Sequence, residues 1–219
     1  MKLPFTAEQF FAVFGTYNEA VWPAQAFLLV IAVIAIALIW FRQRWSGIAV
    51  SAILAFLWAW IGVAYHLAFF AAINPLASVF SAASIAGAMI FLWEGVVRRR
   101  LEFRLARSAR TLAGVLLVLF ALVVYPAWSL AAGHRYPAMP TFGLPCPTTL
   151  FTIGVLAFLV VPHPRLPLAV PVLWCLIGSQ AAFLLDVRQD LALLVAAVVG
   201  IGLMVGHATD SALHRDRAG

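Results

Sequence analysis

Residues 89–124 read MIFLWEGVVRRRLEFRLARSARTLAGVLLVLFALVV, in which six arginines lie between two apolar segments. Arginine is costly in the hydrocarbon core of a bilayer, whereas the flanking segments carry no charged residue except Glu94. A bilayer core of about 30 Å is crossed by about 20 apolar helical residues. The stretch therefore predicts two membrane helices joined by a basic loop.

The rest of the chain has the same composition. Hydrophobic residues make up 65% and charged residues 10% of 219 residues, and the mean hydropathy is +1.03, which is outside the range of soluble domains. Seven apolar stretches are long enough to be candidate spans: 24–41, 47–70, 76–97, 111–131, 148–161, 166–185 and 191–205. We predict an all-α bundle of seven transmembrane helices, forming a single integral membrane domain over residues 1–219.

The distribution of basic residues predicts the orientation of this bundle. With seven spans, all of the 14 basic residues except Lys2, Arg135 and Arg188 fall on one side. The positive-inside rule places that side in the cytoplasm, with the N-terminus outside and the C-terminus inside. We expect a multi-pass protein of a bacterial inner membrane.

The arginine-rich loop predicts a lipid partner. Basic residues next to a membrane helix attract anionic lipids of the cytoplasmic leaflet. The residues expected to do so are Arg98, Arg99, Arg100, Arg104, Arg107 and Arg110. The net charge of +6 does not indicate nucleic-acid binding, because no basic groove with interleaved aromatic residues is present in the sequence.

A short helix is predicted over residues 5–16, before the first span. Thr6 and Gln9 have the spacing of a capping box, and Phe5 and Phe10 stand at the positions of a hydrophobic staple. We expect this helix to lie on the outer surface, with its phenylalanines pressed into the outer leaflet.

The sequence also contains weak internal similarity. Trp58 and Gly62 in the second span have the same spacing as Trp174 and Gly178 in the sixth. Small residues, including the Gly202-xxx-Gly206 pair, are frequent in the third and seventh spans, where they allow close helix approach. The pattern indicates two parallel three-helix repeats joined by the fourth helix, an arrangement found in transporters. Chance matching is the alternative.

Polar residues cluster toward the predicted outer side, where they suggest a binding site. An ionisable group at membrane depth is costly unless it faces the bundle interior or a wet cavity. His66 is the strongest candidate, because Trp58, Gly62 and Phe70 share its helix face. The predicted substrate-binding set is His66, Tyr65, Glu19, Asn74, Gln180 and Asp186. The alternative for His66 is a purely structural histidine that holds helices together.

Other polar residues receive structural interpretations. Glu94 and Arg98 have the spacing of an i,i+4 ion pair. Asp190 opens the seventh span and is a functional candidate by its depth, but at the predicted interface the favoured interpretation is that it faces water. Cys146, between two prolines, is interpreted as a small packed residue, with a reactive thiol or a soft-metal ligand as the alternative. Cys175 is expected to lie too deep in the membrane to pair with it. His207, Asp210 and His214 are expected on a solvated C-terminus.

Several chemistries are excluded by the residues present. The only lysine is Lys2, so no membrane helix can form a retinal Schiff base. No zinc-enzyme spacing, P-loop or Gly-x-Ser-x-Gly motif occurs. We therefore predict neither catalytic nor metal-binding residues, and the cofactor is left open.

Three segments carry a resemblance to a known family. They read Tyr17-Asn18-Glu-Ala-Val-Trp22-Pro23, Tyr65-His66-Leu-Ala-Phe-Phe-Ala-Ala-Ile-Asn74-Pro75 and Pro145-Cys146-Pro147-Thr148-Thr149. With the span layout, the chain resembles a family of small bacterial integral-membrane proteins known as a domain of unknown function. The resemblance covers nearly the whole chain and implies no activity, substrate or active site.

The favoured function is the binding or transport of a small solute or ion in an outward-facing polar pocket. An accessory subunit of a larger membrane complex is the alternative, and a membrane enzyme with an outer-side active site is a third hypothesis. A homo-oligomer is compatible with each of them.

Overall fold

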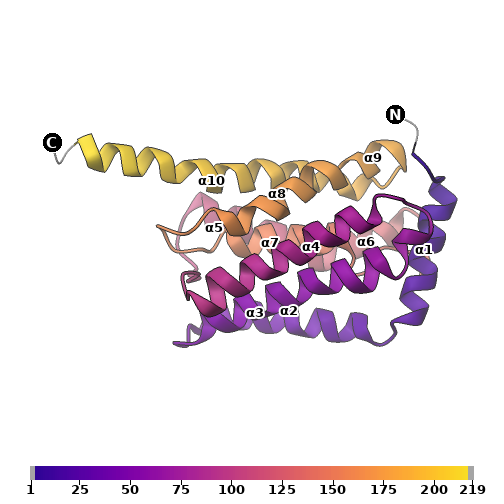
Figure 1. Ribbon diagram of the computed structural model, residues 1–219, viewed down its shortest axis with the longest axis horizontal. Coiled ribbons are helices and arrows are strands. Elements are labelled where there is room, and N and C mark those ends of the chain that lie inside the picture. Colours follow the sequence, from indigo (N-terminus) through magenta and orange to yellow (C-terminus); the bar gives the residue numbers. More distant parts are fainter. Residues whose placement is uncertain (1–2, 217–219) are drawn as a thin grey trace.

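The computed structural model describes the backbone of residues 3–216 and the side chains of residues 3–206 (Figure 1). The elements are α1 (Ala7–Ala20), α2 (Ala24–Phe41), α3 (Ser46–Trp60), η1 (Ile61–Leu67), η2 (Phe70–Ala72), α4 (Ala77–Phe91), η3 (Leu92–Val97), α5 (Ala109–Leu119), η4 (Phe120–Val124), α6 (Tyr125–Ala131), α7 (Pro145–Leu156), α8 (Leu166–Gly178), α9 (Gln180–Leu184), η5 (Arg188–Leu191) and α10 (Ala192–Asp216). Within the described residues there is no β-strand beyond isolated bridges. The fold is all-α, as predicted.

Six helical segments are long and apolar enough to cross a membrane. They are Ala24–Phe41, Ser46–Ala72, Ala77–Val97, Ala109–Ala131, Leu166–Leu184 and Arg188–Gly206. A large part of each segment faces outward with apolar side chains, which is the arrangement of helices that contact lipid rather than water. The chain is a multi-pass membrane protein. The helix α7 is also apolar, but it is shorter than these six segments.

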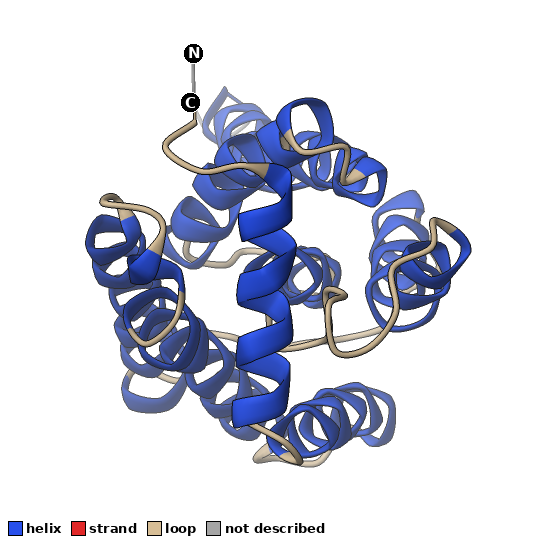
Figure 2. Ribbon diagram, turned by 90° about the vertical axis from the view of Figure 1, so that its right-hand side faces the viewer, coloured by secondary structure: helices blue, strands red, loops and turns tan. Residues whose placement is uncertain are grey.

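The helix α7 occupies the centre of the bundle. Its residues are buried except for the half-buried Cys146, and Figure 2 shows one helix end-on within the ring of the others. The close approach of α5 and α7 depends on two glycines, since a Cβ on Gly114 would lie 2.7 Å from the Gly154 carbonyl oxygen. On another side, the Trp58 indole donates a 3.1 Å hydrogen bond to Thr152 Oγ1. Small and hydroxyl-bearing residues thus let α7 pack on all sides.

The fifth helix differs from the predicted segment 148–161, because it begins three residues earlier and ends at Leu156. Beyond it the chain pairs with the arginine-rich loop: Arg104 N donates to the Phe158 oxygen and Val160 N to the Glu102 oxygen. Extended backbone is also favoured before Pro162. Residues 157–160 therefore form a plug at this end of the bundle instead of a last helical turn.

One arginine of the loop is part of this plug. The Arg110 guanidinium donates to the carbonyl oxygens of Ala157 and Leu159, and its side chain is half-buried. Arg98, Arg99, Arg100, Arg104 and Arg107 are exposed. Of the six arginines predicted to meet anionic lipid, Arg110 thus has an internal hydrogen-bonding role.

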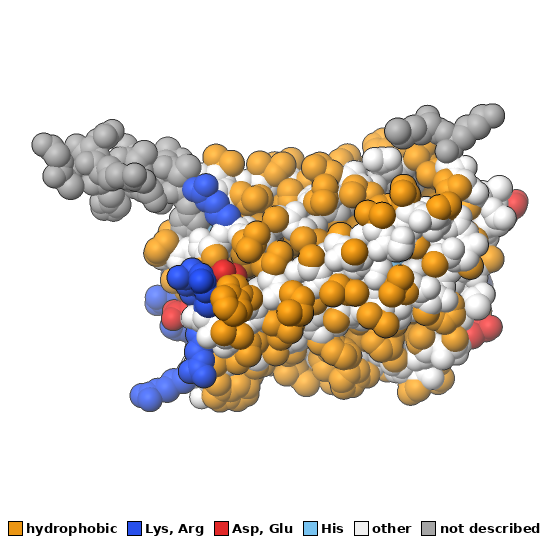
Figure 3. Space-filling model, in the orientation of Figure 1, with side chains coloured by type: hydrophobic (Ala, Val, Ile, Leu, Met, Phe, Trp, Pro, Cys, Tyr) orange, Lys and Arg blue, Asp and Glu red, His pale blue; other side chains and the backbone are white. Residues whose placement is uncertain are grey.

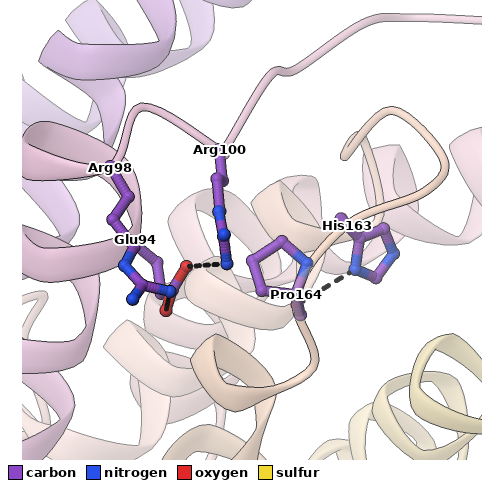
Figure 4. A network of polar contacts seen from close by, with 5 residues as sticks. All are labelled: Glu94, Arg98, Arg100, His163 and Pro164. Carbon is purple, nitrogen blue, oxygen red and sulfur yellow. Dashed lines mark hydrogen bonds and ion pairs between the residues drawn. The ribbon is translucent and has the colours of Figure 1, made fainter.

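Basic side chains gather at the end of the molecule opposite α1, and apolar side chains cover the surface between the two ends (Figure 3). Here Glu94 pairs with Arg98 at 3.9 Å, as predicted, and also with Arg100 at 3.8 Å (Figure 4). We call this end the arginine end. The side chains of Lys2, His207, Asp210, His214, Arg215 and Arg217 lie outside the described residues.

The opposite end is covered by α1, which runs across the other helices (Figures 1 and 2). The predicted capping box is present: Gln9 N donates to Thr6 Oγ1 at 3.2 Å, and Thr6 N donates to Gln9 Oε1 at 2.9 Å. The Phe5 and Phe10 rings stack at 5.8 Å, as the staple predicts. The helix continues to Ala20, beyond the predicted end at residue 16.

The placement of the α1 phenylalanines corrects the sequence interpretation. Phe10 and Phe14 are buried against the bundle end, where they join a core that includes Tyr65 and Phe70. They were expected to insert into the outer leaflet. The amphipathic pattern of α1 identified an apolar face, but that face packs on protein instead of lipid.

Candidate functional site

His66 lies in the core beneath α1, on the π-helical segment η1. Short π-helical segments are rare and occur frequently at functional sites, because the extra residue in the turn re-aims a side chain. The imidazole is 0% exposed and is surrounded by aromatic rings, with the Trp174 ring centroid at 5.0 Å and that of Phe80 at 5.7 Å. The local backbone thus directs a polar ring into an aromatic core.

The imidazole of His66 carries polar atoms without partners. Within the described part of the chain, neither Nδ1 nor Nε2 of His66 has a hydrogen-bond partner, whereas the Trp174 indole interacts with the Cys146 thiol. Each buried, unsatisfied polar group costs about 1–3 kcal/mol. The fold therefore holds the imidazole of His66, with one donor and one acceptor nitrogen, at an energetic cost.

A second set of buried polar groups centres on Asp190. This carboxylate is 1% exposed, and Oδ1 accepts a 2.5 Å hydrogen bond from the Tyr125 hydroxyl. The Cys146 thiol also hydrogen-bonds to it. Next to it, Gln189 Nε2 donates to Ser129 Oγ at 3.0 Å. Residues from α6, α7 and η5 thus enclose a carboxylate that the sequence analysis placed in water.

Gly178 joins the two sets. A Cβ at this position would lie 3.1 Å from Trp174 Nε1 and 3.5 Å from Cys146 Sγ, so both side chains occupy the space that a larger residue would need. One continuous group of polar and aromatic side chains therefore crosses the bundle below α1. We call it the polar belt and define it as His66, Trp174, Cys146, Asp190 and Tyr125.

Tyr17 of α1 closes the belt from above. Its ring lies 5.5 Å from that of Tyr65, and its hydroxyl accepts a 2.7 Å hydrogen bond from Trp60 Nε1. Burial raises the pKa of Tyr17 to about 12, while the Trp60 bond opposes this shift. The phenol is therefore neutral throughout the physiological range and seals the bundle end as a hydrogen-bonded, uncharged group.

The predicted site residues are divided between the core and the surface. Tyr65 and Asn74 are buried, and Asn74 Oδ1 accepts from Leu76 N at 3.0 Å in a local turn. Glu19, Gln180 and Asp186 are exposed, and none of the three hydrogen-bonds to His66. The structure thus brings Tyr65 and His66 together and leaves the predicted polar partners at the surface.

Most residues of the polar belt were not among the predicted site residues. Asp190 lies two residues from the exposed Arg188, and it was predicted to lie at the membrane–water interface. Tyr125 precedes Pro126 in an apolar span, and Trp174 was noted only for its spacing. One feature of the sequence pointed to this region. Trp174 and Gly178 have the same spacing as Trp58 and Gly62, and this match marked Gly178 as a point of close helix approach.

A polar pocket of about 350 Å³ lies at the α1 end, beside the belt. It is lined by Trp128, Ala131, Ala132, His134, Asp186, Arg188 and Gln189. The exposed Asp186 and Arg188 form an ion pair across 2.9 Å at the pocket wall. Gln189 connects the pocket with the interior, because it precedes Asp190 and hydrogen-bonds to Ser129.

The cluster has no metal-binding composition. Within residues 3–206, no group of three or more histidine, cysteine, aspartate or glutamate side chains is arranged to hold a metal ion. The belt instead offers a carboxylate, a thiol, a phenol, an indole and an imidazole. These groups can exchange hydrogen bonds or protons with a small polar species.

Six lipid-facing helical segments, a central buried helix and a polar cluster inside them define a multi-pass α-helical membrane protein. A family model matches residues 7–215, so the chain belongs to a family of unknown function, DUF6064. This confirms the resemblance found in the sequence. No curated protein and no solved structure matches the chain.

Proposed function

We propose that this protein binds a small polar solute or ion at the polar belt and carries it across the membrane. The observation that carries the proposal is the pair of unpartnered ring nitrogens of His66. A solute with one hydrogen-bond donor and one acceptor satisfies both nitrogens of an imidazole that the protein leaves unsatisfied. The buried Asp190 carboxylate supplies a third polar contact, or a site for a proton.

Access is proposed from the α1 end. The polar pocket is lined by Gln189, the residue before the buried Asp190. The belt itself is closed by α1, so binding requires α1 or the α8–α9 junction at Ser179 to move. Ser179 already interrupts the helix between Gly178 and Gln180, directly beside the belt.

The proposed topology has seven crossings. The central α7 together with the turn and loop of residues 157–160 supplies the crossing that is too short to count as a full helix. The arginine end then faces the cytoplasm of a bacterial cell and the α1 end faces outward, because positive charge is retained on the cytoplasmic side. Arg98, Arg99, Arg100, Arg104 and Arg107 are exposed toward the anionic lipid headgroups in this orientation.

We also propose that the chain contains two parallel three-helix repeats. A Cβ on Gly62 would lie 3.1 Å from the Ser81 oxygen of α4, and one on Gly178 would lie 3.0 Å from Leu193 of α10. In both halves, the glycine after the tryptophan therefore faces the next spanning helix. Two such halves around one site are the arrangement expected of a carrier.

The His66→Phe variant tests the function. Purification in mild detergent followed by mass spectrometry of co-purifying small molecules should show a species that the variant loses. Its melting temperature should be unchanged or higher, because two unsatisfied buried nitrogens are replaced by apolar surface. The matched control is Phe91→Leu, a fully buried core position on α4, which should lower the melting temperature but retain the solute.

Two outcomes would contradict the proposal. If His66→Phe melts lower and retains every small molecule, His66 has a structural role. If the wild type carries no small molecule but co-purifies with another protein chain in a fixed ratio, the accessory-subunit function is correct.

A further inference from the structure

A second pocket, of about 230 Å³, opens on the lipid-facing side of the bundle between α2 and the η4–α6 segment. It is lined by Trp22, Gln25, Ala26, Leu29, Ala121, Leu122, Tyr125, Pro126, Met139, Pro140, Thr141, Phe142 and Pro147. Trp22, Ala26 and Leu29 are exposed at its edge. Since α2 and α6 belong to segments that are long and apolar enough to span a membrane, a ligand of this pocket would come from the bilayer.

One polar atom in the pocket has no partner. Gln25 is 8% exposed, and Oε1 accepts no hydrogen bond within the described residues. The amide orientation is fixed, because Nε2 lies 2.8 Å from the Asn18 carbonyl oxygen and 3.3 Å from Asn18 Oδ1 and must donate to both. The acceptor Oε1 is therefore the group that remains for a ligand.

The position of Gln25 is rigidly supported. Asn18 Nδ2 donates to the carbonyl oxygens of Pro137 and Met139 at 2.6 and 2.8 Å, and Asn18 Oδ1 accepts from Thr141 Oγ1 at 2.7 Å. The segment that holds Asn18 also forms the pocket wall at Met139 and Thr141. An acceptor held in this way loses little conformational freedom when a ligand binds.

The lining selects the chemical class of the ligand. It contains no charged side chain, and its only other hydroxyl groups are those of Tyr125, which is bonded to Asp190, and Thr141, which is bonded to Asn18. A charged headgroup would have no counter-charge there, whereas an apolar chain with one neutral donor fits both features. The volume is below the range of about 300–1,000 Å³ that is usual for drug-sized ligands, so one chain segment fits rather than a whole diacyl lipid.

We propose that this pocket binds a neutral, single-chain membrane amphiphile whose hydroxyl group donates a hydrogen bond to Gln25 Oε1. The chain lies against Leu29, Leu122 and Phe142. The site is separate from the polar belt, with which it shares only Tyr125.

The probe for this site is decan-1-ol, compared with its methyl ether, which has the same chain but no donor. Native mass spectrometry of the protein released from detergent micelles measures the one-to-one adduct of each. Decan-1-ol should bind more tightly than the ether by roughly three- to tenfold, the range of one neutral hydrogen bond. Gln25→Met should abolish this preference.

Ala26→Phe keeps Gln25 intact and places a ring at the edge of the pocket, so it tests the site even if Gln25→Met does not fold. This variant should lose the adduct, whereas Val30→Phe, on the same helix but outside the lining, should bind as the wild type does. Equal binding of alcohol and ether, or an adduct that persists in Ala26→Phe, would overturn the proposal.

Discussion

The Tyr125 hydroxyl lies 2.5 Å from Oδ1 of Asp190, and this hydrogen bond joins α6 to the start of the last spanning segment. The two residues are 65 positions apart and both are buried. A hydrogen bond to a buried carboxylate is shorter and stronger than one between neutral groups. The contact therefore fixes the α1 end of the bundle as well as the polar belt.

Tyr125→Phe should destabilise the protein by about 1–3 kcal/mol, because the Asp190 carboxylate loses its phenolic donor while remaining buried. Thermal unfolding in detergent measures this change. Asp190→Asn is the matched variant: its amide oxygen can still accept from Tyr125, so its melting temperature should stay near that of the wild type. A Tyr125→Phe melting curve equal to that of the wild type would contradict the structural importance of the bond.

The crossing of α5 and α7 should not tolerate an added methyl group. A Cβ on Gly154 would lie 2.8 Å from Val118 Cγ2 and 2.9 Å from the Gly114 carbonyl oxygen. Gly154→Ala should therefore lower stability by about 1–3 kcal/mol through overpacking. Gly202→Ala is the control, since nothing lies within 4 Å of that Cβ and alanine favours the helix. Equal melting temperatures for the two variants would show that α7 is less tightly enclosed.

The stability of the protein at alkaline pH should depend on Tyr17. Its pKa is about 12 in the folded chain and 10.0 ordinarily, so between these values the unfolded chain releases the proton first. Stability contributed by the neutral phenol is thus complete below pH 10 and falls as pH rises toward 12, by up to about 1.4 kcal/mol per pH unit. Melting temperatures between pH 9 and 12 should fall less steeply for Tyr17→Phe. Parallel curves would exclude this contribution.

The proposed orientation is tested by thiol labelling of intact cells. Ala106→Cys lies in the arginine-rich loop and Ala132→Cys at the α1 end, and both positions are exposed. An impermeant maleimide should label Ala132→Cys alone, with the wild type as the blank for Cys146 and Cys175. Labelling of Ala106→Cys from outside would reverse the topology.

Two arginines of the same loop should behave differently. Arg110→Ala removes the donors to the Ala157 and Leu159 carbonyl oxygens and should lower the melting temperature. Arg107→Ala should leave melting unchanged and reduce only the retention of anionic lipid, measured by native mass spectrometry. If both variants lose lipid and neither loses stability, the plug of residues 157–160 does not depend on Arg110.

The fold was predictable where local sequence determines it. Thr6 and Gln9 identify the start of α1 because a capping box involves only four consecutive residues. The apolar segments identify the spans because their length and composition must match the bilayer. Glu94 and Arg98 were paired correctly because one helical turn separates them. The end of α7 was wrong, since the partners of its last carbonyls lie on a loop some 50 residues away.

The polar belt was less predictable. His66 was selected from its depth and its aromatic neighbours, but its closest polar neighbour, Trp174, comes from a helix more than 100 residues later. Asp190 was missed because its neighbours Asp186 and Arg188 are exposed, so the local pattern indicates a wet loop. The Asp190 carboxylate is removed from water only when the chain folds and brings Tyr125 beside it.

Local sequence is enough to establish an all-α membrane protein with basic residues concentrated at one end. Helix propensity, hydrophobic length and charge act within one segment or between a segment and the bilayer. Contacts between distant segments make α7 central, place α1 on protein, and bury Asp190, His66 and Gln25. These features depend on which helix faces come together, and that is settled by close packing between residues far apart in the chain.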